Sequence, residues 1–152
     1  MSASAATIHA TALVLGEDGI LLRGSAGAGK SSLARDLVQR ARETGRHAAL
    51  VADDRVALAA AHGRVLARPP SAIAGLLEIR GVGIVRVPFV EAAVLRLVVD
   101  LEHVPARLLD EDAGSVSLQG IPLPRIAADR ASALGSVMWR LGHLHDPFVT
   151  VP

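Results

Sequence analysis

The sequence contains no cysteine and no tyrosine, and its 152 residues include one tryptophan and two phenylalanines. The absence of cysteine excludes disulfides, zinc–thiolate sites and thiol catalysis, and it is compatible with a reducing cytosol. The scarcity of aromatic rings removes the stacking platforms on which single-stranded nucleic acids bind. Hydrophobic residues make up 51% of the chain and are mostly Ala, Val and Leu. We therefore expect a core of aliphatic layers, as in α/β proteins.

The sequence also lacks a concentration of one charge and a long hydrophobic run. Its formal net charge is +1 and its basic residues are scattered, which argues against nucleic acid as a partner. No apolar stretch reaches the roughly 18 residues of a transmembrane helix. The N-terminus lacks the basic and apolar regions of a signal peptide. We expect a soluble, cytoplasmic protein with no membrane partner, and one domain over residues 1–152 with a frayed segment at 1–7.

One stretch, GSAGAGKS from Gly24 to Ser31, matches the phosphate-binding pattern G-x-x-x-x-G-K-[ST]. Glycines let backbone N–H groups face a phosphate chain, the lysine reaches the β- and γ-phosphates, and the serine holds Mg²⁺. An apolar run at 19–23 and helical spacing over 31–44 supply the expected strand and helix. These flanks favour the motif over a flexible glycine-rich turn. The candidate nucleotide-binding residues are Gly24, Ser25, Ala26, Gly27, Ala28, Gly29, Lys30, Ser31 and Ser32.

Two carboxylates, Asp53 and Asp54, follow a short apolar run at 48–52. Such a run is typical of a buried parallel strand that ends at the sheet edge where a phosphate loop lies. One aspartate commonly helps to hold Mg²⁺ there, and a second is not needed for the metal alone. The alternative is an ordinary Asp-Asp turn, but the upstream loop favours a functional pair.

The remaining pattern predicts hairpins and two helices. Strands are expected at 8–15 and 20–23, joined by a turn at 16–19, at 56–60 and 64–67, at 94–101, at 116–118 and at 121–126. Ser71 is expected to cap a short helix, and Asp129 a final helix whose apolar face contains Ala133, Leu134, Val137, Met138 and Leu141. Residues 102–114 are expected to form an exposed, mobile loop.

Three polar residues interrupt apolar segments. His9 is the only polar ring in the strand expected at 8–15, and on the pattern alone we favour a half-exposed strand histidine. Glu78 and Arg80 lie among apolar residues, and buried charges are costly unless they are paired or used. A structural Glu78–Arg80 ion pair and a functional role are equally compatible with that pattern.

Taken in order, His9, the glycine-rich loop, VADDRV at 51–56 and LEIRGVGI at 77–84 resemble the catalytic domain of HPr kinase/phosphorylase. The Glu-Ile-Arg-Gly-x-Gly-Ile segment is the specific part, and the resemblance covers residues from about 5 to 126. It implies an α/β fold with a phosphate-loop core like that of phosphoenolpyruvate carboxykinase, a mixed sheet with hairpins, and flanking helices. It also implies an ATP- and Mg²⁺-dependent serine kinase that acts on HPr, a small phosphocarrier protein. Many members also remove the phosphate by phosphorolysis, and members assemble as hexamers.

The resemblance also implies individual roles. Lys30 would contact the β-phosphate, and Ser31, Asp54 and Glu78 would hold the metal. Asp53 matches the aspartate that takes the proton of the substrate serine. His9 and Glu78 match residues near the metal and phosphate. Arg107 lies where the family has an arginine in a mobile loop associated with dephosphorylation, and these three residues complete the catalytic set.

The chain departs from the family pattern at three places. The family's usual N-terminal domain is absent, which suggests a minimal form. Ser32 stands where an acidic residue is usual, and the Pro-x-Arg-Pro-Gly-Arg-Asn run that bears on subunit and HPr contacts is reduced to PRIAADR at 124–130. An enzyme and a nucleotide-sensing binding module that keeps the fold therefore remain open. A small-molecule kinase is a weaker third option, because few aromatic residues are available to line a pocket.

Overall fold

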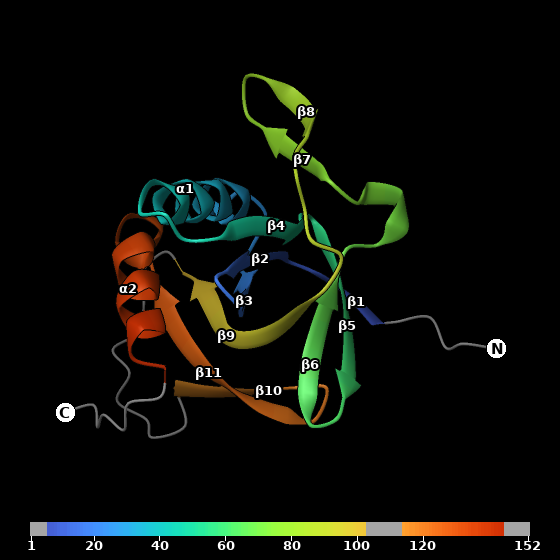
Figure 1. Ribbon diagram of the computed structural model, residues 1–152, viewed down its shortest axis with the longest axis vertical. Helices are drawn as coiled ribbons and strands as arrows, with labels where there is room; N and C mark the ends of the chain where they lie inside the picture. Colours follow the sequence, from blue (N-terminus) through green and yellow to red (C-terminus); the bar gives the residue numbers. More distant parts are fainter. Residues whose placement is uncertain (1–5, 103–113, 145–152) are drawn as a thin grey trace.

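This computed structural model describes residues 6–102 and 114–144. Their main element is a curled mixed sheet. The strands of this sheet are β1 (Ala6–His9), β2 (Thr11–Leu15), β3 (Asp18–Arg23), β4 (Ala48–Ala52), β5 (Arg55–Ala61), β6 (Arg64–Arg68), β9 (Ala93–Leu101), β10 (Ser115–Leu118) and β11 (Ile121–Ala128). Their order is β1-β5-β6-β9-β3-β2-β4, and β11 pairs with β9 and β10. Helices α1 (Lys30–Glu43) and α2 (Arg130–Gly142) lie side by side against the sheet (Figure 1).

Both faces of the central strands are buried, which explains why they read as nearly continuous apolar runs. On one face, Leu22 and Val99 pack with Leu33 and Leu37 of α1 and Val137 of α2. The other face curls on itself and buries side chains of β2, β3, β4, β5, β6 and β9, among them Leu21, Val51, Val56, Val65 and Val98. The expectation of aliphatic layers is confirmed.

The strand expected at 8–15 is divided at Ala10, because its two halves have different partners. β1 pairs antiparallel with β5, whereas β2 pairs antiparallel with both β3 and β4. The predicted turn at 16–19 is confirmed, since Leu15 lies opposite Asp18 at the end of the β2–β3 ladder. The break at Ala10 allows one apolar run to enter two parts of the sheet.

The expectation that the strand before Asp53 pairs in parallel is wrong in detail. The neighbour of β4 is β2, and the pair is antiparallel. Because β2 is antiparallel to β3 as well, β3 and β4 run in the same direction and end at the same edge. Asp53 therefore follows β4 at the edge where β3 enters the Gly24–Ser31 loop.

A second, two-stranded sheet protrudes from the body at the top of Figure 1. It consists of β7 (Leu76–Ile79) and β8 (Gly83–Arg86) and follows a 3₁₀ turn, η1 (Ser71–Ile73). Ser71 is the first residue of this turn and Pro70 holds the capping position, so the predicted serine cap is wrong. Glu78 and Arg80 are exposed and form no ion pair with each other in the described residues. Neither charge is buried, so the expectation of buried charges at these positions is wrong.

The end of the described chain agrees with the sequence pattern. The β5–β6 hairpin is confirmed, and it turns at His62 and Gly63, both with positive φ. Asp129 caps α2 by accepting a hydrogen bond of 2.8 Å from the backbone N–H of Ser132, and this bond lowers the pKa of its carboxyl. The loop expected at 102–114 lies almost wholly outside the described residues. No helix in the described ranges is long and apolar enough to cross a membrane.

Candidate functional site

The chain passes from β3 into α1 through a turn that only glycine accommodates easily. Gly27 and Gly29 have φ values of 83° and 100°, in the left-handed region that side-chain-bearing residues rarely adopt. A Cβ built on Gly27 would meet no atom within 4 Å, so this part of the loop faces open space. A turn hydrogen bond of 3.0 Å, from the Ala28 N–H to the Ser25 carbonyl, closes the loop.

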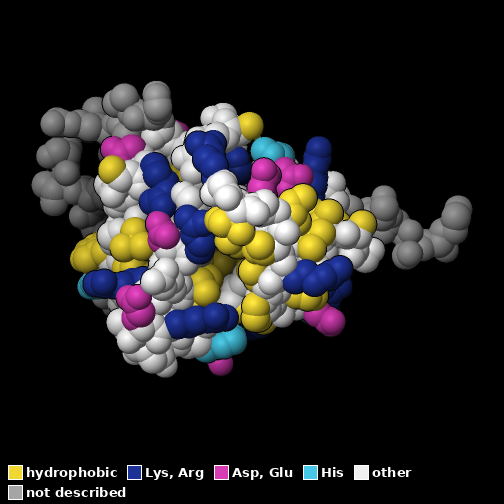
Figure 2. Space-filling model, turned by 90° about the horizontal axis from the view of Figure 1, so that it is seen from above, with side chains coloured by type: hydrophobic (Ala, Val, Ile, Leu, Met, Phe, Trp, Pro, Cys, Tyr) yellow, Lys and Arg dark blue, Asp and Glu magenta, His cyan; other side chains and the backbone are white. Residues whose placement is uncertain are grey.

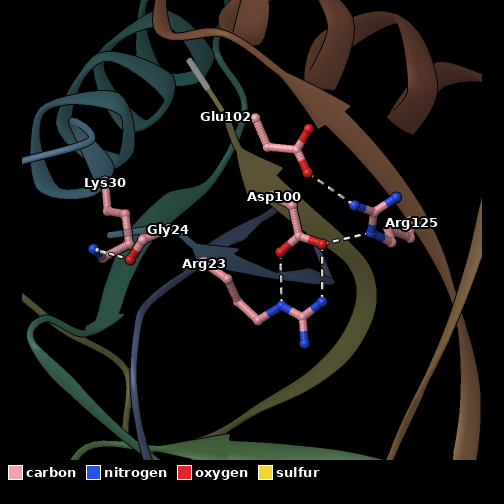
Figure 3. Close-up of polar contacts among 6 residues, drawn as sticks. All are labelled: Arg23, Gly24, Lys30, Asp100, Glu102 and Arg125. Atoms are coloured by element: carbon pink, nitrogen blue, oxygen red, sulfur yellow. Dashed lines mark hydrogen bonds and ion pairs between the residues drawn. The ribbon is translucent and has the colours of Figure 1, made fainter. Parts of the chain in front are cut away.

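The Lys30 ammonium lies across this loop. Its Nζ donates hydrogen bonds of 2.7 Å to the Gly24 carbonyl and 3.0 Å to the Ser25 carbonyl, and the residue is 7% exposed. Figure 3 shows the contact with Gly24 at the carboxyl end of β3. Within the described residues this ammonium donates to neutral carbonyls and to no carboxylate, which suits the loop to an anion.

Asp53 and Ser31 join the loop to the next strand. The Ser31 hydroxyl donates a hydrogen bond of 2.7 Å to Asp53 Oδ1, and the Thr11 hydroxyl donates one of 2.8 Å to the same oxygen. Asp53 is 7% exposed, and its Oδ2 receives no hydrogen bond within the described residues. A serine oxygen and a sheltered carboxylate thus converge at the helix N-terminus.

Asp54 points to a different neighbour from Asp53. Its φ of 70° turns the chain at the end of β4, and its Oδ1 lies 3.0 Å from His9 Nε2. The two side chains are 71% and 44% exposed. The half-exposed strand histidine expected from the pattern is confirmed, and the fold pairs it with the second aspartate. Of the adjacent carboxylates, one therefore faces the loop and the other faces solvent.

Not every predicted site residue joins this group. Glu78 lies exposed on the protruding β7–β8 sheet, and the described residues contain no group of three His, Cys, Asp or Glu side chains that could hold a metal ion. Ser32 lies in the first turn of α1, where its hydroxyl donates to the Gly29 carbonyl at 3.2 Å. Arg107 falls outside the described residues. The structure thus brings together His9, Asp53 and Asp54 with the loop.

Sequence reasoning missed a charge cluster beside the loop, formed by Arg23, Asp100, Glu102 and Arg125 (Figure 3). Arg23 donates to both oxygens of Asp100, at 2.8 and 2.9 Å. Arg125 donates to Asp100 as well and to Glu102 at 3.3 Å. The hydrogen bond from Arg23 to Asp100 raises the pKa of Arg23. An arginine directly before the motif and an aspartate at a strand end were the available signals, but neither indicates its partner.

A hollow of about 590 Å³ lies between α1, β4 and the segment around β7 and β8. Apolar side chains from α1, β4 and the segment around β7 and β8 line it together with polar and charged side chains of α1. The lining residues are Ala34, Arg35, Val38, Gln39, Arg42, Glu43, Leu50, Leu77, Val87 and Pro88. Figure 2 shows hydrophobic side chains between basic ones over this side of the molecule. No residue of the Gly24–Ser31 loop lines this hollow.

Comparisons with known proteins find relatives in one family of kinases. The family described as HPr Serine kinase C-terminal domain matches residues 1–112. The HPr kinase/phosphorylase of Streptococcus thermophilus is 33% identical over 132 residues, which cover 79% of this chain and 41% of the relative. That of Halalkalibacterium halodurans is 47% identical over 70 residues, which cover 45% of this chain and 21% of the relative.

A solved structure extends the likeness to the fold. The Hpr(Ser) kinase/phosphatase from Coxiella burnetii matches with a TM-score of 0.75 and 26% identity, covering 91% of this chain and 95% of that one. The chain spans about two fifths of the length of the Streptococcus relative. On the family match and the shared fold, this chain belongs to the HPr Serine kinase C-terminal domain family.

Proposed function

We propose that this chain transfers a phosphoryl group from ATP, with Mg²⁺, to a serine of HPr or of an HPr-like phosphocarrier protein. The observation that carries the proposal is the hydrogen bond between Ser31 and Asp53. It joins the last residue of the phosphate-loop motif to a carboxylate at the end of β4, and in phosphate-loop enzymes such a serine and such an aspartate together hold Mg²⁺. The names of the relatives support HPr as the acceptor.

The residues present fit both cofactors. The open glycine loop and Lys30 would hold the phosphates, and the oxygens of Ser31 and Asp53 are hard ligands of the kind that Mg²⁺ prefers. A magnesium site needs only one or two protein oxygens when phosphate oxygens and water complete the shell, so a three-carboxylate cluster is not required. Bound Mg²⁺ would neutralise the charge on the phosphate oxygens.

The hydrogen bonds favour a division of roles opposite to the one implied by the resemblance. Asp53 is sheltered and bonded to Ser31, which suits the carboxylate on the metal side. Asp54 is exposed beside His9, where a serine hydroxyl of a protein substrate can reach it. We propose that Asp54 accepts the serine proton and that His9 orients its carboxylate. The alternative keeps Asp53 as the base and Asp54 on the metal side.

The proposal also includes the further expectations that follow from the family resemblance. They are a second, phosphorolytic activity that uses Arg107, a contribution of Glu78 to the metal site, a phosphate-loop core of the phosphoenolpyruvate carboxykinase type, a hexamer, and a cytoplasmic location. Sedimentation at micromolar concentration tests the hexamer. The phosphorolytic activity is tested by incubating phosphorylated carrier with inorganic phosphate and measuring pyrophosphate.

The decisive experiment for the kinase is incubation with γ-labelled ATP, Mg²⁺ and HPr-type carriers. We expect acid-stable phosphoserine on the carrier, and none on a carrier whose target serine is replaced by alanine. Lys30→Ala is the matched inactive variant, with its fold checked by circular dichroism. ATP binding without transfer to any carrier would favour the nucleotide-sensing module, and no ATP binding would overturn both functions.

A further inference from the structure

Arg130, the first residue of α2, lies directly against the phosphate-loop motif. A Cβ built on Gly29 would lie 2.8 Å from Arg130 Cδ and 3.2 Å from its Cγ. The Arg130 side chain therefore occupies the place that any larger residue at 29 would need. Its Nε donates to the Ser32 hydroxyl at 3.0 Å, and its Nη2 donates to Asp36 Oδ2 at 2.6 Å.

These contacts define one side of the start of α1. Gly29, Ser32 and Asp36 follow the spacing of a single helix face, which here faces α2. Lys30 folds over the loop, and Ser31 turns to Asp53. A second cation thus stands beside the first turn of α1, where backbone N–H groups without helical partners favour anions.

The Arg130 guanidinium is held at two nitrogens and has a third to offer. Its Nη1 makes no hydrogen bond to any residue in the described ranges, and the side chain is 35% exposed. A guanidinium fixed in this way loses little freedom when its remaining donors meet a phosphate oxygen. Asp36 balances its charge only in part, because the Asp36 side chain is 43% exposed.

We propose that Arg130 is a nucleotide-binding residue, which donates from Nη1 to a phosphate oxygen of ATP held at the Gly24–Ser31 loop. The inference rests on the proposed function, since it takes ATP as the ligand. It adds an arginine from the other helix to the residues of the motif. The competing interpretation is that Arg130 only fastens α2 to α1.

Two variants at the same ion pair separate these interpretations. Arg130→Gln removes the charge and keeps most of the stem, whereas Asp36→Asn keeps an oxygen that can accept from Nη2 and removes the opposing charge. A direct phosphate contact predicts that R130Q weakens Mg²⁺–ATP binding by about 10- to 100-fold, the range for losing a hydrogen bond to a charged group. It also predicts that D36N binds ATP equally well or more tightly.

Calorimetric titration with Mg²⁺–ATP and with inorganic tripolyphosphate measures both effects, and thermal unfolding reports the stability of each variant. Arg35→Gln is the matched control, because this exposed arginine also lies near Asp36, at 4.0 Å, and its loss changes the net charge equally. R35Q is expected to bind ATP like the wild type. Arg130→Lys, which keeps a cation, is expected to recover part of the affinity.

Two results would overturn the inference while leaving the proposed function intact. One is wild-type ATP affinity in a folded R130Q. The other is an equal loss of affinity in R130Q and D36N that follows their loss of stability. Absence of ATP and tripolyphosphate binding in the wild type would overturn the proposed function itself, and with it the role of Arg130.

Discussion

The guanidinium of Arg23 forms a bidentate ion pair with the carboxylate of Asp100. Arg23 ends β3 and directly precedes the Gly24–Ser31 loop, and Asp100 lies near the end of β9. Arg125 of β11 donates to the same carboxylate. Because β3 and β11 both run parallel to β9, the three strands end together, and Asp100 ties them beside the loop. The charge cluster therefore fixes the point from which the loop departs.

Asp100→Asn is expected to lower the free energy of unfolding at pH 7 by about 1–3 kcal/mol, because it replaces the carboxylate partner of Arg23 with a neutral amide and removes one of the carboxylates that Arg125 contacts. Urea unfolding measures this effect. Asp18→Asn is the control, since Asp18 faces Arg46 at 3.5 Å in a looser pair, and its loss should cost under about 1 kcal/mol. Equal costs at the two positions would show that the charge cluster does not stabilise this edge.

Acid is expected to remove the same contribution. Burial raises the pKa of Asp100, but hydrogen bonds from Arg23 and Arg125 outweigh it and hold the pKa below its ordinary value of 3.8. A depressed pKa stabilises the fold at pH values above the unfolded pKa, and this stabilisation is lost as the pH falls through the folded pKa. Below about pH 4, the stability difference between wild type and D100N should therefore shrink. A difference that stays constant down to pH 2.5 would contradict this linkage.

Asp53→Asn and Asp54→Asn should differ in how their activity responds to Mg²⁺. If Asp53 is the metal-side carboxylate, D53N lowers the apparent Mg²⁺ affinity, and high metal concentration partly restores its rate. D54N is then expected to bind Mg²⁺–ATP normally and to lose about 10²–10⁴-fold in rate, the usual contribution of a general base. Steady-state rates across a Mg²⁺ series measure both. The exchanged pattern would return the base to Asp53, and identical behaviour would refute either division.

Asp54 adopts a left-handed backbone conformation that carries an energetic cost for most side chains, with φ of 70°. Asp54→Gly should therefore be more stable than Asp54→Ala by about 1 kcal/mol, although both lose phosphoryl transfer. Thermal and urea unfolding measure the difference. Gln39, an exposed residue within α1, is the control of opposite sign, because Q39G should be less stable than Q39A by about 1 kcal/mol.

Gly29→Ala is expected to be more harmful than Gly27→Ala. Both positions have positive φ, but only a Cβ at 29 meets the Arg130 side chain. Unfolding of G29A, R130A and the double variant gives their coupling energy, expected at about 0.5–3 kcal/mol for residues in contact. The double variant should recover part of the loss in G29A. Additive losses would show that the backbone conformation alone requires glycine at position 29.

Local patterns in the sequence identified much of the fold and of the candidate site. Glycine spacing marked the loop, an apolar run ending in carboxylates marked Asp53 and Asp54, and helical periodicity marked the buried face of α2. These features are readable because backbone conformation and side-chain periodicity act over a few residues. The exposure of Glu78 was misread, since a short apolar segment looks the same in a core strand and in a protruding hairpin.

Which distant residues meet depends on the tertiary fold. Arg23 and Asp100 are 77 residues apart, and Arg130 lies 98 residues from Ser32 and 94 from Asp36. No local pattern encodes such pairs, because they depend on strand order and on how the whole chain buries apolar surface and neutralises charge. Local sequence patterns alone predicted a loop suited to phosphate and two adjacent carboxylates. The fold decided that one carboxylate faces the loop and the other faces solvent, and that a second helix brings an arginine beside Gly29 and Ser32.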